Sequence, residues 1–191
     1  MKCKFAFVFL CLSLVCPACM GQTTGVHGNI FREATMGLTY EFPEKLSPKV
    51  GSEMPQPFRD ATGRERFILT LWDTPQQGAA LRMAFLYDTK QRGSDRTRDT
   101  IALAYIGEIK RTWLGVKDVQ MAGPTKVSRS SSDYWRMDFS APDQVPRYNS
   151  AIVITLSDRR VLVIRVGAPS QSELDDEVDS LARMRFDKSQ K

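Results

Sequence analysis

The sequence predicts a single α+β domain, in which an antiparallel sheet of about six strands packs with two main helices. Two observations carry this prediction. Short runs of alternating apolar and polar residues, joined by tight turns, indicate strands that pair as antiparallel hairpins. Two longer segments repeat their apolar residues at helical spacing, and each needs the face of a sheet to cover its apolar side. We find no internal repeat and no second domain, so residues 31–187 are predicted to fold as one unit.

The first residues have the order of a signal peptide. Lys2 and Lys4 form a basic start, and mostly apolar residues follow at positions 5–15. This length fits the hydrophobic region of a signal peptide, whereas a transmembrane helix needs about 20 apolar residues. Pro17 and Gln22 end the apolar run too early for a span. Residues 1–21 are therefore predicted to be a signal peptide, and the protein to be exported to the periplasm or secreted.

The cleavage position has two alternatives. Small residues before Gln22 suit cleavage at that position, which would free the chain from the membrane. Cleavage after Ala18 would instead leave Cys19 first, where acyl chains could be attached as in a lipoprotein. Cys16 and Pro17 differ from the branched and small residues usual before a lipidated cysteine. A lipid on Cys19 is the one membrane contact that the sequence suggests.

Composition narrows the class of protein. All four cysteines lie within residues 1–21, so the body has no disulfide and no thiolate metal site. A body of this length can rely on its hydrophobic core, which is typical of bacterial envelope proteins rather than of small disulfide-rich secreted domains. Without Lys2 and Lys4 the chain has 25 basic and 22 acidic residues, a net charge of +3. This small excess gives no indication of nucleic-acid binding.

The first third of the body combines regular and irregular segments. Polar, glycine-rich residues 22–30 are expected to form a flexible leader. Apolar and polar residues alternate over 37–43, which predicts a half-buried strand that ends at a proline. The proline-rich residues 47–65 predict a long surface loop and a candidate contact surface. Residues 67–72 and 81–87 then predict a hairpin.

A helix is predicted over residues 99–114. Asp99 suits its N-cap, and Gly115 suits the position just after its C-terminus. Gly107 is unfavourable inside a helix and suggests close packing there. The predicted buried stripe consists of Ala102, Tyr105, Ile106, Ile109 and Trp113.

The remaining elements form the C-terminal half of the domain. Ser170 and Glu173 have the spacing of a capping box, which predicts the start of the last helix. Phe186 is expected to anchor the chain end in the core. The strands are predicted at 124–129, 134–140, 150–156 and 160–166, and the last two, nearly apolar on both faces, are expected to be central.

We find no combination of side chains that is typical of a catalytic or a metal-binding site. The one histidine of the chain, His27, lies in the expected leader, where no packing would hold it beside a nucleophile or among metal ligands. The acidic residues 173–179 are explained by the favourable position of negative charge at a helix N-terminus. We therefore expect no enzyme activity, no cofactor and no metal site.

The order of these elements, and one motif, resemble the photosystem II subunit P (PsbP)-like domains and their bacterial exported relatives. Phe31, Arg32 and the sequence at 37–43 resemble the opening of these domains, and the likeness covers about residues 29–187. It implies a twisted antiparallel sheet packed between helices. Members are mostly non-enzymatic and bind protein partners or act as envelope lipoproteins, without a shared catalytic motif. Leu46 is a departure, because many relatives have tryptophan there.

Three hypotheses for function follow. The first is an exported, non-catalytic envelope protein that serves as an interaction or accessory module for an unknown protein partner. The second is a carrier of a small apolar ligand, in a pocket between sheet and helix lined by Met83, Phe85, Trp113 and Trp135. The third is a hydrolase that uses two converging carboxyl groups, at least one with a raised pKa.

Overall fold

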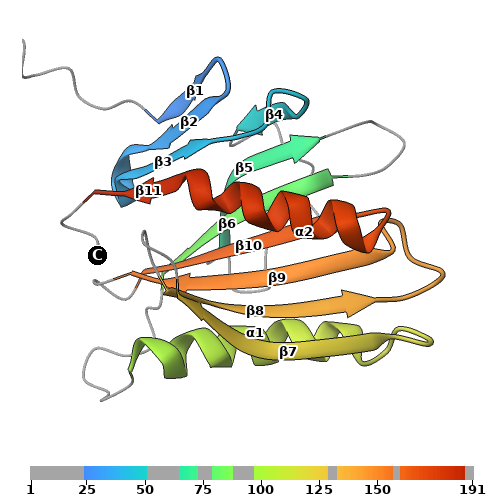
Figure 1. The fold of residues 1–191 in the computed structure, drawn as a ribbon. Helices are drawn as coiled ribbons and strands as arrows, with labels where there is room; N and C mark the ends of the chain where they lie inside the picture. Colours follow the sequence, from blue (N-terminus) through green and yellow to red (C-terminus); the bar gives the residue numbers. More distant parts are fainter. Residues whose placement is uncertain are drawn as a thin grey trace, which may run out of the picture.

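The computed structural model describes residues 24–50, 65–72, 79–87, 97–128, 133–156 and 160–187, without the side chains of residues 65–67, 72 and 79–87. A seven-stranded antiparallel sheet is the middle layer, with strand order β4-β5-β6-β10-β9-β8-β7. A four-stranded sheet, β1-β2-β3-β11, and helix α2 cover one face, and helix α1 covers part of the other (Figure 1). The elements are β1 (Gly25–His27), β2 (Ile30–Glu33), β3 (Leu38–Glu41), β4 (Ser47–Val50), β5 (Glu65–Trp72), β6 (Ala79–Tyr87), α1 (Arg98–Trp113), β7 (Gln120–Ser128), β8 (Asp133–Ser140), β9 (Tyr148–Thr155), β10 (Arg160–Ala168), α2 (Gln171–Ser180) and β11 (Met184–Phe186).

Strands β9 and β10 form the centre of the large sheet, as their sequence predicted. β10 pairs with β9 on one side and with β6 on the other. Ile152, Val153, Leu162 and Ile164 are buried on these two strands, so neighbouring residues that point to opposite faces are both covered. Both faces of a strand can be buried in this way only where the sheet has a layer on each side.

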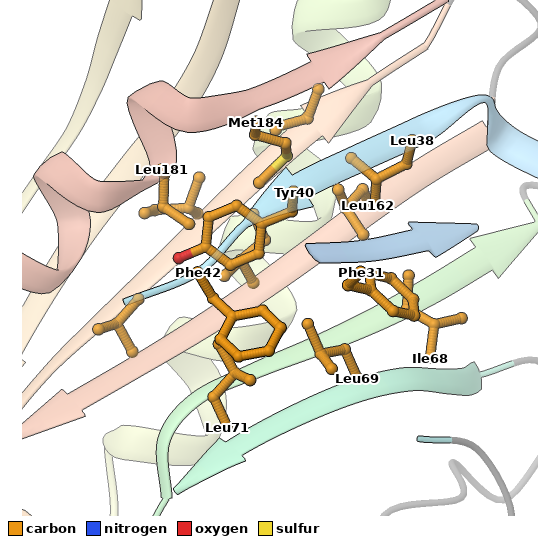
Figure 2. Close-up of a cluster of buried hydrophobic side chains, with 14 of the residues drawn as sticks. Phe31, Leu38, Tyr40, Phe42, Ile68, Leu69, Leu71, Leu162, Leu181 and Met184 are labelled. Atoms are coloured by element: carbon orange, nitrogen blue, oxygen red, sulfur yellow. The ribbon is translucent and has the colours of Figure 1, made fainter. Parts of the chain in front are cut away.

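The large sheet separates two hydrophobic cores. The first, here called the α2 core, lies between the large sheet and the layer of α2 and the small sheet; it includes Phe31, Tyr40 and Leu162 (Figure 2). The second, called the α1 core, lies between α1 and strands β8, β9 and β10; it includes Ile106 and Val153. Each core buries the apolar side of one helix, as the spacing of apolar residues required.

The small sheet was not predicted as a separate sheet, although its strand β3 confirms the strand predicted within 37–43. Residues 24–30 are not a flexible leader: β1 pairs with β2 across a two-residue turn in which Gly28 has φ +60°. Val26 packs against the α2 core, which gives this short strand an apolar contact. The expected loop at 47–65 begins with β4, an edge strand paired with β5. The large sheet therefore has seven strands, whereas about six were predicted for the whole domain. The small sheet adds four further strands.

The helix ends agree with the sequence at α2 and differ at α1. Ser170 is the N-cap of α2 as predicted, and its hydroxyl accepts a hydrogen bond from the Glu173 amide. The Glu173 carboxylate accepts from the Ser170 hydroxyl at 2.7 Å, whereas a capping box would use the Ser170 amide. At α1 the N-cap is Thr97 and not Asp99, because Thr97 has the extended backbone and accepts from the Thr100 amide. Asp99 lies in the first turn and is free to bond elsewhere.

The small sheet contains both the first and the last strand of the described chain, β1 and β11. β11 pairs with β3, and Phe186 is 6% exposed, which confirms its expected role as an anchor. The Asp187 amide donates a hydrogen bond to the carbonyl oxygen of Gly37. The last described segment therefore lies beside β3, whereas β1 is at the opposite edge of the small sheet (Figure 1).

Candidate functional site

Trp113 is a component of the α1 core. It is the last residue of α1 and is partly buried against that core. Its ring stacks on Phe139 of β8, with centroids 5.0 Å apart and an angle of 11° between the ring planes. This contact fixes the C-terminal end of α1 to the sheet, because stacked aromatic pairs stabilise beyond the area that they bury.

Trp135 fixes the other end of the same helix. Its indole N–H donates to Asp99 Oδ1 at 2.9 Å, and the Lys126 ammonium donates to Asp99 Oδ2 at 2.9 Å. These two hydrogen bonds, that from Lys126 above all and then that from Trp135, lower the pKa of the Asp99 carboxyl. Asp99 thus joins α1 to β7 through Lys126 and to β8 through Trp135.

Replacing Asp99 with alanine is expected to lower the free energy of unfolding by about 1–2 kcal/mol, because the indole N–H of partly buried Trp135 then lacks an acceptor. Urea unfolding of the two proteins measures this difference. Asp133→Ala is the matched control, since its carboxylate lies 3.8 Å from the same Lys126 ammonium and is exposed. An equal loss in both variants would contradict a specific role of the indole bond.

The four residues predicted to line a pocket lie on α1, β6 and β8. Trp113 and Trp135 pack against the α1 core. For Met83 and Phe85 the structure describes the backbone and the register on β6, without the side chains. Met83 pairs with Ile164, and Phe85 pairs with Leu162, which are both residues of the α2 core on the opposite face of the sheet.

Arg136, next to Trp135 on β8, ties the second helix to the same strand. Its Nε donates to Asp138 Oδ1 and its Nη2 donates to Asp175 Oδ1 of α2, both at 2.8 Å. Burial opposes the charged form of Arg136, but the two carboxylates outweigh it and raise the pKa of the guanidinium. Neighbouring residues of a strand point to opposite faces. β8 therefore holds α1 through Trp135 and α2 through Arg136.

A buried polar group lies on the other flank of α2. The hydroxyls of Tyr40 and Ser180 are 2.8 Å apart, and the Ser180 hydroxyl donates to the carbonyl oxygen of Glu177. Because that bond uses the serine hydrogen, Tyr40 is the donor in the first pair. The Lys45 ammonium lies 2.8 Å from Glu177 Oε1. Glu177 is 4% exposed, and its Oε2 has no hydrogen-bond partner among the described residues.

The titration properties of these groups favour structural roles. Burial, opposed by the bond with Ser180, raises the pKa of Tyr40 to about 12, so the phenol stays protonated. The hydrogen bond from Arg136 lowers the pKa of the Asp175 carboxyl, as happens at Asp99. A general acid among carboxyl groups would need the opposite shift. His27 lies exposed at the end of β1.

The described residues contain neither a candidate metal site nor a helix that could span a membrane. Within the described ranges, no group of three or more His, Cys, Asp and Glu side chains could hold a metal ion. No described helix has the length and hydropathy needed to cross a bilayer. The predicted signal peptide at 1–21 and the predicted lipidation at Cys19 lie outside the described residues.

The outer side of α1 is a surface that the sequence reasoning missed. Leu103 is 36% exposed, and Leu114, which caps the helix, is 64% exposed. Ala104 is also exposed, and Gly107 is half-buried. A helix that covers a sheet usually carries polar and charged residues on its outer side. Here Arg111 is the single charged residue near the middle of that side.

Gly107 adds to the unusual character of this surface. The sequence suggested that it marks close packing, but a Cβ placed on it meets no described heavy atom within 4 Å. The described residues therefore supply no reason for a glycine that weakens the helix by about 1 kcal/mol relative to alanine. We define the outer face of α1 as Leu103, Ala104, Gly107, Arg111 and Leu114.

Comparison with known proteins gives one informative result. No protein-family model matches the sequence, and no curated protein matches it either. The solution structure of cyanobacterial PsbP (CyanoP) from Synechocystis sp. PCC 6803 is similar over 88% of this chain and 99% of that chain. The TM-score is 0.51 and the sequence identity is 11%, so the likeness concerns the fold. The chain accordingly has a PsbP-like α+β fold.

Proposed function

We propose that this chain is an exported accessory protein of the bacterial envelope that binds a protein partner and catalyses no reaction itself. The basic start and apolar run of residues 1–21 support export. The observation that carries the binding role is the outer face of α1, where Leu103 and Leu114 are exposed beside Ala104 and Gly107. Contiguous exposed apolar surface is typical of protein-binding sites.

The helix that presents this face is held rigidly at both ends. Asp99 binds Trp135 near its N-terminus, and Trp113 stacks on Phe139 near its C-terminus. A preorganised surface loses little conformational entropy on binding. Trp135 and Trp113, which were predicted to line a pocket, thus support α1 on the side that faces the sheet.

Native mass spectrometry of the protein isolated from the envelope of its host tests the proposal. We expect a stoichiometric protein partner with the wild-type chain, and its loss with Leu114→Glu, which places a charge on the outer face. Val145→Glu is the matched control, because Val145 is 79% exposed in the connection between β8 and β9 and is not part of α1. The same spectrum reports the processed N-terminus and any acyl chain on Cys19.

Two results would contradict the proposal. Retention of the partner by Leu114→Glu would exclude the outer face of α1 as the binding surface. A monomer that carries a small apolar molecule and no protein would favour the alternative of a ligand carrier.

A further inference from the structure

We propose that the outer face of α1 binds the same face of a second copy of this chain, with the two helices antiparallel. The inference rests on the proposed binding role of this face and names its partner. It begins from the helical positions. At 3.6 residues per turn, Leu103 and Leu114 lie on one side of the midline of the face, and Arg111 lies on the other, with Glu108 at the border of the face on the Arg111 side. Gly107 lies between the two pairs.

A twofold axis makes this arrangement self-complementary. In an antiparallel pair, residues at equal distances from the axis along the two helices meet, and each side of the midline meets the same side of the second copy. An axis near residue 109 places Leu103 opposite Leu114 of the second copy. The same axis places Glu108 opposite Arg111 of the second copy. Each contact occurs twice, once on either side of the axis.

In the antiparallel arrangement, Glu108 and Arg111 of the two copies are complementary in charge. Within one chain, Glu108 Oε1 and Arg111 Nη2 are 4.0 Å apart, with side chains 60% and 70% exposed. An exposed ion pair of this kind contributes little, so both side chains can turn toward the second copy. In a parallel pair, Arg111 would face Arg111 of the second copy across the midline, and like charges would oppose binding.

Size and shape determine the expected affinity. Gly107 leaves open space above the helix, which lets a second backbone or the stem of Arg111 approach closely. A helix of 16 residues is about 24 Å long, and one face of it buries less than the roughly 800 Å² per partner of a standard stable interface. We therefore expect a dimer that dissociates on dilution, with a dissociation constant in the micromolar range.

Sedimentation velocity, run from low to several hundred micromolar on the chain as the cell processes it, measures this equilibrium. We expect Leu114→Glu to weaken the dimer at least about tenfold, because it places a charge in the apolar contact. Val145→Glu changes an exposed residue outside α1 and should leave the equilibrium unchanged. A chain that stays monomeric throughout, or a dimer equally strong in both variants, overturns the inference.

A charge exchange tests the ion pairs across the axis. Glu108→Arg alone and Arg111→Glu alone should each weaken the dimer, since each places like charges opposite one another. The double variant should restore wild-type affinity, because it exchanges the two partners of the same contact. Failure of the double variant to restore the dimer overturns the proposed register.

Cross-linking tests the direction of the helices, since all four native cysteines lie in residues 1–21. Chains with Leu103→Cys mixed with chains with Leu114→Cys should form a disulfide between copies, and neither variant should do so alone. Cross-linking of Leu103→Cys with itself would overturn the antiparallel arrangement. If the wild-type chain is monomeric yet Leu114→Glu loses another protein partner, the second copy is excluded and the proposed function remains.

Discussion

Replacing Leu162 with alanine is expected to lower the free energy of unfolding by about 3–5 kcal/mol, near the top of the range for leucine-to-alanine changes in cores. Leu162 is fully buried in β10 and pairs with Ile154 of β9 and with Phe85 of β6. Its side chain lies in the α2 core together with Leu38 of β3 and Phe31 of β2 (Figure 2). The cavity would lie between two paired sheets, which cannot easily collapse to fill it.

Urea unfolding measures this loss, and Leu114→Ala is the matched control. Leu114 is 64% exposed, so the same truncation there should change stability by less than about 0.5 kcal/mol. In thermal unfolding, each kcal/mol corresponds to about 2–4 °C for a domain of about 150–250 residues. A loss below about 1 kcal/mol at Leu162 would mean that the small sheet does not pack tightly on the large one.

The two helices and the central strands could be predicted because their side chains carry a strong local pattern. β9 and β10 are apolar on both faces, and Ser170 with Glu173 marks the start of α2. In the small sheet, β3 shows such an alternation and was predicted within 37–43, whereas the two edge strands do not. β1 and β11 contain three residues each, which is too short for an alternation to show, and they are held by pairing with β2 and β3. Gly28 before Asn29 was the local hairpin signal, and the polar composition around it suggested a leader instead.

The contacts around β8 depend on residues that lie far apart in the sequence. The inward position of Trp135 followed from alternation, whereas its hydrogen bond to Asp99 spans 36 residues. The same applies to Arg136 and Asp175, which are 39 residues apart. Local sequence cannot specify which polar residues meet when a helix and a strand pack together, because that depends on how the layers are placed.

The outer face of α1, in contrast, had a local signal. Leu103, Gly107 and Leu114 recur at helical spacing, on the side opposite the predicted buried stripe. The helix therefore has a second, weaker apolar stripe, which Arg111 interrupts. The sequence analysis named only the stronger stripe, which is the buried one. The second stripe was the local signal for the outer face.

Above about pH 10, stability is expected to fall as Tyr40 loses its proton more readily in the unfolded chain than in the folded one. Burial raises its pKa from 10.0 to about 12, so between these values the folded protein holds a proton that the unfolded chain releases. Unfolding then releases protons, and a rise in pH favours it. The contribution of Tyr40 is therefore fully present below pH 10.0 and is lost as the pH rises toward about 12. The slope in this window is about 1.4 kcal/mol per pH unit.

Comparison with Tyr40→Phe isolates this contribution from the other groups that titrate at high pH. Near neutral pH, the variant loses the hydrogen bond to Ser180, which lowers stability by about 0.5–1.5 kcal/mol. The Ser180 hydroxyl keeps its bond to the Glu177 carbonyl, so no buried donor is left unpaired. From about pH 9 to 11, the wild-type protein should lose about 1.4 kcal/mol more than the variant, and the two stability curves should converge or cross. Parallel curves would mean that the phenol titrates as it does in the unfolded chain. Water would then reach Tyr40 between β3 and α2. This result would contradict the burial of Tyr40 beneath α2 in the α2 core.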